Sequence, residues 1–215
     1  MKGIIATQAR VLSPLYYHGL YVPDGSATFP RILTDTSMMF ALAHALGMPP
    51  TLLPRSKPDY RTDLDQIPWR ASLFFSEDAT VMAPVRHIID VEREGGYTET
   101  MQKNMASGNF KKTFYVHEIA PGACYQGYLF GSDPFRTYRT ESLVVRLGVG
   151  RTGIVELTAI ENDTRFPAQL NAATLALWGQ RVPVAYRIID TIQPTESMPA
   201  EEAYELWLQC SRFGP

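Results

Sequence analysis

The first segment of the chain, residues 2–12, alternates between apolar and polar positions and predicts a β-strand with one buried face. Gln8 and Arg10 lie in the middle of its polar side. The opposite side carries Ile5, Thr7, Ala9 and Val11. A sheet that is covered on one face and polar on the other is the expected setting for such a strand.

Two stretches have the 3.6-residue periodicity of helices. The first begins at Thr34 or Asp35, either of which can cap it, and ends at Gly47 before Pro49 and Pro50. The second covers residues 200–210. Residues 168–178 predict a short third helix, and residues 51–66 read as a polar surface connection. Residues 69–82 predict a strand or a bent pair of strands, and residues 85–91 are a short apolar run. Further strands are predicted at 111–116, 142–147, 154–160 and 182–189, the last at a sheet edge because it contains Pro183.

Residues 95–110 are polar, contain glycine and have no clear periodicity. Inside a compact fold such a stretch is expected to project as an arm or a functional loop. We therefore predict one domain over residues 1–215, with residues 84–113 as a projecting insertion, which we call the thumb.

Composition indicates an ordinary globular protein, because 45% of residues are hydrophobic and 20% are charged. The two cysteines, Cys124 and Cys210, are too few for a disulfide scaffold and favour a reduced, cytoplasmic protein. No segment approaches the roughly 20 apolar residues of a membrane span. The amino-terminal segment predicts a strand rather than a signal peptide.

The net charge of −2 argues against a free-standing nucleic-acid binder. The charges are unevenly placed, however, because residues 101–187 hold ten Lys/Arg against six Asp/Glu. The last 25 residues carry four glutamates against Arg212 alone. A basic centre and an acidic end suit a subunit that contacts phosphate on one side and protein on another, although an ordinary solvated surface is the alternative.

Residues 148–153 match G-x-G-x-x-G letter for letter. A dinucleotide site needs a helix after this turn, whereas a β-rich run follows here, so that function is excluded by context. Gly148 and Gly150 would instead allow close approach of an RNA backbone beside Arg146 and Arg151. A plain hairpin turn remains the alternative.

Lys103, Lys111 and Lys112 lie close to Phe110, Phe114 and Tyr115 in the sequence. Single-stranded nucleic acid favours this combination, since ammonium groups bind the backbone and flat rings stack on bases. The alternative is a strand start whose aromatic side chains belong to the core.

No metal site or cofactor is predicted, because the four histidines and two cysteines lack metal-ligand spacing and no P-loop or H-E-x-x-H occurs. No catalytic residue is assigned. One enzymatic alternative is a metal-independent endoribonuclease that uses Tyr16, Tyr17 or His18 with a lysine.

Three stretches together resemble a known group of proteins. The start KGIIATQARVLSP resembles the first strand of RAMP proteins, a family of CRISPR subunits. The helix RILTDTSMMFALAHALG and the hairpin LVVRLGVGRTGIVEL resemble the first helix and the glycine-rich segment of the fifth Cas family. The small size resembles the compact subunits of type IV or type I-D systems, with type IV favoured.

This resemblance implies a ferredoxin-like, RRM-type α/β core with an antiparallel sheet and a projecting thumb or β-hairpin. It implies a non-catalytic subunit that binds the 5′ handle of the guide RNA at the foot of the complex. Its partners would be the guide RNA, the backbone subunit, the large subunit and, indirectly, target DNA. The alternatives are processing of precursor guide RNA and an α/β protein-interaction domain unrelated to nucleic acid. The residues predicted to contact RNA are Gln8, Arg10, Lys103, Lys111, Lys112, Arg136, Arg139, Arg146, Gly148, Gly150 and Arg151.

Overall fold

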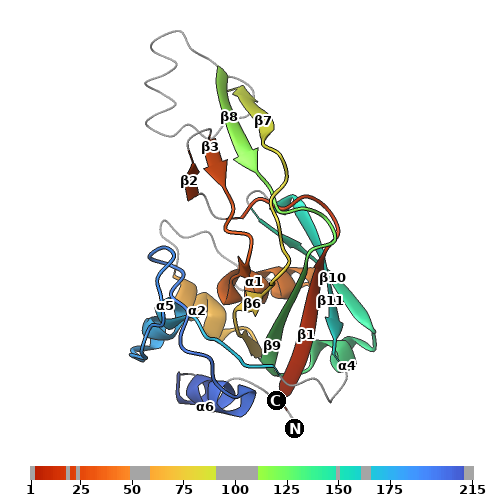
Figure 1. The fold of residues 1–215 in the computed structure, drawn as a ribbon. Coiled ribbons are helices and arrows are strands. Elements are labelled where there is room, and N and C mark those ends of the chain that lie inside the picture. Colours follow the sequence, from red (N-terminus) through yellow and green to blue (C-terminus); the bar gives the residue numbers. More distant parts are fainter. Residues whose placement is uncertain are drawn as a thin grey trace.

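The computed structural model describes residues 3–17, 20–22, 25–48, 59–90, 111–148, 151–160 and 166–210. Figure 1 shows a body made of one large curved sheet with helices packed around it, and a smaller sheet that extends beyond this body. No described helix is long and apolar enough to cross a membrane.

The large sheet is antiparallel throughout and has the order β10-β11-β1-β9-β6-β4, with β5 also pairing with β9. Its centre is the long pair β1–β9, in which Ile4 opposes Phe130 and Arg10 opposes Cys124. The strands are β1 (Ile4–Val11), β4 (Ile32–Leu33), β5 (Trp69–Ala71), β6 (Phe74–Phe75), β9 (Cys124–Gly131), β10 (Ser142–Leu147) and β11 (Gly153–Ala159).

The order of elements confirms the predicted ferredoxin-like α/β core. Along the chain, β1 is followed by α1 (Asp35–Ala45), then by β5 and β6, then by β9, α4 (Pro134–Tyr138) and the β10–β11 hairpin. Across the sheet, β11 and β9 flank β1, and β5 and β6 lie beyond β9. This is a β-α-β-β-α-β arrangement in which the second helix is one short turn and β10 adds an outer strand.

Helix α1 covers one face of the sheet because its apolar positions recur at helical spacing. Met38, Met39 and Leu42 are fully buried against β1 residues such as Ala9 and Val11. The helix ends as predicted at Gly47, whose φ of +69° places it in the left-handed region. The amide of Met48 then donates to the carbonyl of Ala43 at 2.8 Å, the bond of a Schellman motif.

The lower part of the other face is covered by α6 (Ala200–Cys210). Its buried residues Ala203 and Trp207 pack in one cluster with Tyr128 and Phe130 of β9. The upper part of this face carries Gln8, which is half-buried, and the exposed side chains of Arg10 and Gln126. One face of the sheet is therefore apolar along its length, and the other changes from apolar to polar.

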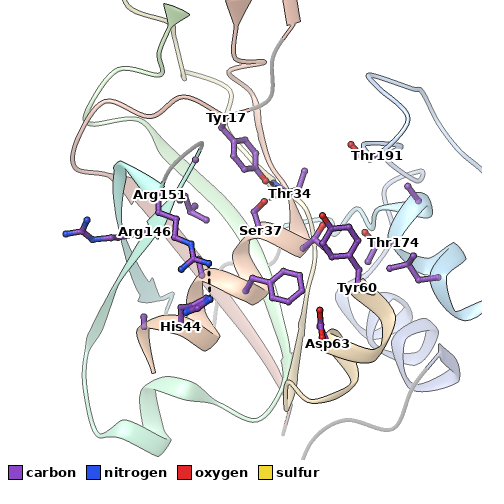
Figure 2. Close-up of a pocket in the computed structure, with 18 of the residues that line it drawn as sticks. Tyr17, Thr34, Ser37, His44, Tyr60, Asp63, Arg146, Arg151, Thr174 and Thr191 are labelled. Carbon is purple, nitrogen blue, oxygen red and sulfur yellow. Dashed lines mark hydrogen bonds between the residues drawn. The ribbon is translucent and has the colours of Figure 1, made fainter. Parts of the chain in front are cut away.

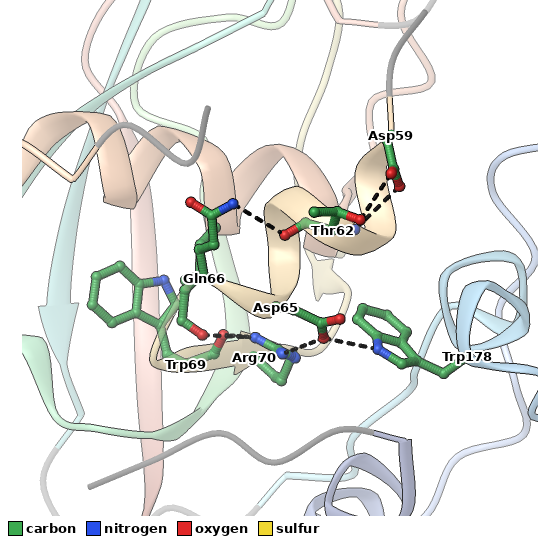
Figure 3. A network of polar contacts seen from close by, with 8 residues as sticks. Asp59, Thr62, Asp65, Gln66, Trp69, Arg70 and Trp178 are labelled. Carbon is green, nitrogen blue, oxygen red and sulfur yellow. Dashed lines mark hydrogen bonds and ion pairs between the residues drawn. The ribbon is translucent and has the colours of Figure 1, made fainter. Parts of the chain in front are cut away.

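A buried arginine joins this second cluster to the segment before β5 (Figure 3). Arg70 is fully buried, and its Nη1 donates to the carbonyls of Ile67 at 2.9 Å and Trp69 at 2.8 Å. Its guanidinium lies 5.4 Å from the ring centroid of Trp178 and 6.0 Å from that of Trp207. Burial lowers the pKa of Arg70 to about 10, partly offset by Asp65, so it stays charged at neutral pH.

The smaller sheet has the order β2-β3-β8-β7. It consists of β2 (Leu20–Val22), β3 (Gly25–Ala27), β7 (Val85–Asp90) and β8 (Lys111–His117). In Figure 1, β7 and β8 point away from the body. Residues 91–110, which make up most of the predicted thumb, lie outside the described residues, so the thumb over residues 84–113 stays a prediction.

The structure corrects several elements expected from the sequence. The edge strand at 182–189 is wrong, because the segment makes only isolated bridges, such as Val184 with Thr195. Residues 51–66 are not only a connection, since Tyr60–Asp65 forms helix α2, which buries Leu64. The central strand β9 and helix α4 were missed. The remaining helices are α5 (Ala172–Leu175) and the 3₁₀ turn η2 (Ala176–Trp178), which confirm the helix expected there.

We expect Arg70→Ala to lower the free energy of unfolding by about 3 kcal/mol or more. It would leave two carbonyls without their donor and remove a side chain packed against two indole rings. Chemical denaturation of the two proteins measures this loss. In the matched control, Arg187→Ala, only the exposed pair with Asp190 is lost, which is worth about 0.5 kcal/mol. Equal losses in the two variants would contradict a structural role for Arg70.

Candidate nucleic-acid interface

A pocket of about 1060 Å³ lies beside the edge of the large sheet (Figure 2). One wall is helix α1, and a second is formed by the end of β10 and the turn to β11. Helix α2 and the segment around Thr174 and Thr191 close the other sides. Segments that lie far apart in the sequence therefore meet here.

Helix α1 contributes a stripe of side chains to the pocket. Ser37, Phe40, Ala41 and His44 line it and follow one another at three- and four-residue spacing. The opposite face of the same helix is buried on the sheet. The pocket wall is therefore the outward face of a helix whose position is set by the core.

The Arg151 and His44 side chains meet across the pocket wall. Arg151 Nη2 donates to His44 Nε2 at 3.0 Å, which requires this nitrogen of the imidazole to be unprotonated. Loss of hydration, and then the charge of Arg151, hold the pKa of His44 below its ordinary value. Arg151 has a φ of +55°, a left-handed conformation that is uncommon for residues other than glycine. The backbone at Arg151 is therefore strained, and both side chains of the pair are exposed. We call Arg151 and His44 the basic corner of the pocket.

Aromatic rings and carboxylates lie on the other side of the pocket. The rings of Phe40 and Tyr60 have centroids 6.0 Å apart and are tilted by 55°, and Tyr60 is 52% exposed. Asp63 and Asp190 also line the pocket. In Figure 2, Tyr60 and Asp63 lie on the side away from Arg151 and His44. The pocket therefore has a basic end, aromatic rings and an acidic end.

Two buried hydrogen-bond networks hold the pocket walls in place. Tyr17 accepts a hydrogen bond from the Thr34 amide at 2.7 Å and pairs with the Thr34 hydroxyl, which in turn donates to Ser37. Thr34 is the N-cap residue of α1, but its side chain makes no capping bond. Burial raises the pKa of the Tyr17 phenol well above its ordinary value.

The second network joins α1 to the carboxy-terminal segment. Asn171 Nδ2 donates to Asp35 Oδ1 at 3.2 Å and to the carbonyl of Thr191 at 2.9 Å. Asp35 is fully buried, and this burial raises the pKa of its carboxyl group. These bonds fix the wall that contains Thr191.

Three of the residues predicted to contact RNA share the polar face of the sheet. Gln8 and Arg10 project from the same side of β1. On the neighbouring strands, Glu156 of β11 lies directly opposite Arg10, and Val144 of β10 lies opposite Glu156. Arg146 follows Val144 by two residues on β10 and is exposed. In Figure 2, Arg146 points away from Arg151, so the two side chains lie on opposite sides of the β10 edge.

The glycines of the β10–β11 turn have a structural reason to be there. A Cβ on Gly148 would lie 2.5 Å from the carbonyl oxygen of Tyr16, and one on Gly153 would lie 2.3 Å from Leu15 Cδ1. Both glycines allow the turn to pack on residues 15 and 16. The predicted approach of RNA at Gly148 stays a prediction.

The other predicted residues are spread around the molecule. Arg136 and Arg139 are exposed on and just after α4, whose N-cap Asp133 accepts from the amide of Phe135 at 2.9 Å. Lys111 and Lys112 begin β8 in the smaller sheet, far along the chain from the pocket elements. Lys103 and Gly150 lie outside the described residues.

The sequence analysis missed the pocket residues His44, Phe40 and Tyr60. A polar and aromatic stripe at helical spacing on α1 was the available signal, but Tyr60 lies in a segment that was read as a connection. Among the described residues, no group of three or more His, Cys, Asp or Glu side chains could hold a metal ion.

We expect Gly148→Ala to be markedly more destabilising than Gly122→Ala. Both glycines have positive φ, +89° and +92°, so each substitution costs roughly 1–2 kcal/mol of backbone strain. Only at position 148 does the added Cβ meet a neighbouring backbone, because nothing lies within 4 Å at Gly122. Equal midpoints of urea unfolding for the two variants would show that the contact with Tyr16 carries no cost.

We expect Arg151→Gln to raise the pKa of His44, since one of the two causes of its depression is removed. The value should stay below that of a free histidine because the loss of hydration remains. NMR titration of the histidine ring protons, assigned with a His44→Gln variant, measures it. Arg146→Gln is the control and should leave the pKa unchanged, because that side chain points away. An unchanged pKa in Arg151→Gln would refute the pairing.

Comparison with known proteins adds to this geometry. No curated protein matches the sequence. Among solved structures, a chain of the cryo-EM structure of the type III-B Cmr-beta bound to cognate target RNA and AMPPnP has a TM-score of 0.42 and 10% identity. The alignment covers 91% of this chain and 84% of that chain. A likeness this weak carries no argument here.

A family comparison is far more informative. Residues 3–198 match the family described as type I-D CRISPR-associated protein Cas5/Csc1. The match agrees with the resemblance to the fifth Cas family, whereas the preference for type IV is not confirmed. Because most of its length is matched, the chain belongs to the type I-D Cas5/Csc1 family of CRISPR-associated proteins.

Proposed function

We propose that this chain is a non-catalytic subunit that binds the 5′ handle of the guide RNA and caps the foot of the backbone filament. Its family makes it an RNA-binding subunit of a CRISPR effector complex. The proposal adds binding to the 5′ handle, a position at the foot of the filament and the absence of catalysis.

The observation that carries the proposal is a set of exposed arginines without acidic partners. None of them forms an ion pair with a described carboxylate. Guanidinium groups in this state can bind phosphate oxygens without first breaking an ion pair. The predicted members of the set are Arg10, Arg136, Arg139, Arg146 and Arg151, of which Arg151 already donates to His44. Arg31, Arg61, Arg86 and Arg181 are also exposed and form no ion pair with a described carboxylate, so the predicted residues are distinguished by their position on the polar sheet face, at the β10 edge and at α4.

The geometry of the β10 edge supports a single-stranded ligand. Both arginines line the pocket, but in Figure 2 the Arg146 side chain points away from Arg151, so a strand that crosses this edge meets a cation on each side. Gln8 can contribute hydrogen bonds on the polar side. Phosphate contacts of this kind position a nucleic acid without reading its sequence.

The overall charge favours shared rather than independent RNA binding. At a net charge of −2 the chain repels phosphate at long range, and RNA affinity depends strongly on the number of phosphates neutralised. We therefore propose that the adjacent backbone subunit and the large subunit complete the RNA site. Contact with target DNA would be indirect, through these neighbours.

A non-catalytic role is consistent with the state of Tyr17. Its phenol is buried and hydrogen-bonded to Thr34, and its raised pKa makes it a poor proton donor or acceptor at neutral pH. Of the other residues named for the alternative endoribonuclease, Tyr16 is half-buried and His18 lies outside the described residues. Cleavage of repeat-derived RNA by the purified chain in EDTA would support that alternative.

The test is to co-express the chain with the proteins encoded beside it and a guide-RNA array, and to purify and sequence the bound RNA. We expect short guides with uniform 5′ ends. The double variant Arg10→Glu/Arg146→Glu should reduce bound RNA by about tenfold or more, because two phosphate contacts become repulsive.

The matched control is the double variant Arg61→Glu/Arg181→Glu, which reverses two exposed arginines that do not line the pocket. It makes the same change of charge as the test variant and should keep its RNA. RNA-free complexes of wild-type protein, or guides whose 5′ ends are unchanged when this chain is omitted, would overturn handle binding.

A further inference from the structure

We propose that the pocket between α1, α2 and the β10–β11 turn binds one nucleotide unit, with its phosphate at Arg151 and His44 and its base against Tyr60 and Phe40. The inference rests on the proposed function, because the nucleotide would come from the guide RNA. A guide-RNA strand at the β10 edge can turn one of its nucleotides into the pocket. The shared chemistry is that of a nucleoside monophosphate.

The pocket has the capacity for such a ligand. Its volume of about 1060 Å³ lies at the upper end of small-molecule sites, which span roughly 300–1,000 Å³. Its position beside an exposed strand edge leaves it accessible to a polymer. The same α1 stripe and α2 wall that form it are anchored by buried residues, so the shape is held by the core.

The phosphate position follows from the basic corner. Arg151 presents a planar guanidinium with several donors, suited to two phosphate oxygens at once. His44 Nε2 accepts a hydrogen bond from this guanidinium at 3.0 Å, so the imidazole orients Arg151, and an anion bound to Arg151 would lie beside the ring without a hydrogen bond from Nε2. The left-handed backbone at Arg151 turns its side chain toward α1 rather than outward with Arg146.

The base position follows from the rings. Tyr60 is half exposed and forms a tilted pair with Phe40, so one ring face remains open to the pocket. Stacking on an aromatic side chain tolerates any of the four bases and is the usual way to hold an unstacked nucleotide.

The Asp63 carboxylate sets the orientation of the ligand. Asp63 lines the pocket on the side of Tyr60, away from Arg151, and Asp190, which also lines the pocket, is paired with the exposed Arg187. Asp63 would repel a phosphate placed at its end of the pocket, whereas it can accept hydrogen bonds from amino or imino groups of a base. Only one of the two possible orientations of a nucleotide avoids the repulsion.

The experiment uses the whole complex with its guide RNA and compares wild type with Tyr60→Leu and Arg151→Gln. Chemical probing with dimethyl sulfate and a 2′-hydroxyl acylating reagent reports each handle nucleotide. We expect one nucleotide that is shielded in wild type to become about tenfold more reactive in both variants. The rest of the handle should stay protected. Arg61→Gln is the matched control on α2, since Arg61 is exposed but does not line the pocket.

The outcomes separate this inference from the proposed function. A handle that is protected equally in wild type and both pocket variants overturns the pocket assignment and leaves handle binding intact. If wild-type complexes show no shielded handle at all, the proposed function fails. In that case, NMR titration of the full chain with AMP, CMP, GMP and UMP tests the nucleotide site. Binding that is weakened about tenfold in Arg151→Gln identifies a free nucleotide as the ligand. If none of the four nucleotides binds, the inference is overturned.

Discussion

The antiparallel pairing of β1 with β9 is the interaction on which the rest of the structure depends. It joins residues 4–10 to residues 124–130, which lie more than a hundred positions further along the chain. The two faces of this strand pair then pack against different helices. Tyr125 and Leu129 of β9 face α1, while Tyr128 and Phe130 face α6. Gly127 lies between them, and a Cβ there would come within 2.6 Å of the Phe74 ring. The central strand thus sets where both helices lie.

The candidate site is a consequence of this packing rather than a separate feature. Because α1 is held on the sheet, its outward stripe of Ser37, Phe40 and His44 faces the pocket. The β10–β11 turn reaches that stripe because it packs on residues 15 and 16 through its glycines. The networks of Tyr17 and of Asn171 then fix the remaining walls. A rigid pocket of this kind loses little conformational entropy when it binds a ligand.

The charges of the protein are organised locally, which reconciles an acidic chain with an RNA-binding role. Exposed arginines occupy the polar sheet face, the β10 edge and the region of α4, whereas the Asp63 carboxylate of the pocket lies at its opposite end. Glu156, directly across from Arg10, weakens the field of that face. Such an arrangement favours contacts at short range over long-range attraction of any polyanion. It suits a subunit whose RNA is delivered as part of an assembly.

Elements with local signals could be predicted from the sequence. The alternation in β1, the periodicity and glycine stop of α1, the β10–β11 hairpin and α6 all follow from neighbouring residues, whereas the fold class came from the resemblance of three stretches to a known family. Strand β9 has almost no alternation because it is buried on both faces along half its length, and only the tertiary structure revealed it. The strand expected at 182–189 did not form, because within the described part of the chain this segment makes only isolated bridges, such as Val184 with Thr195. The pocket, too, was decided by tertiary structure, since His44, Tyr60 and Arg151 are brought together by long-range packing that no local pattern records.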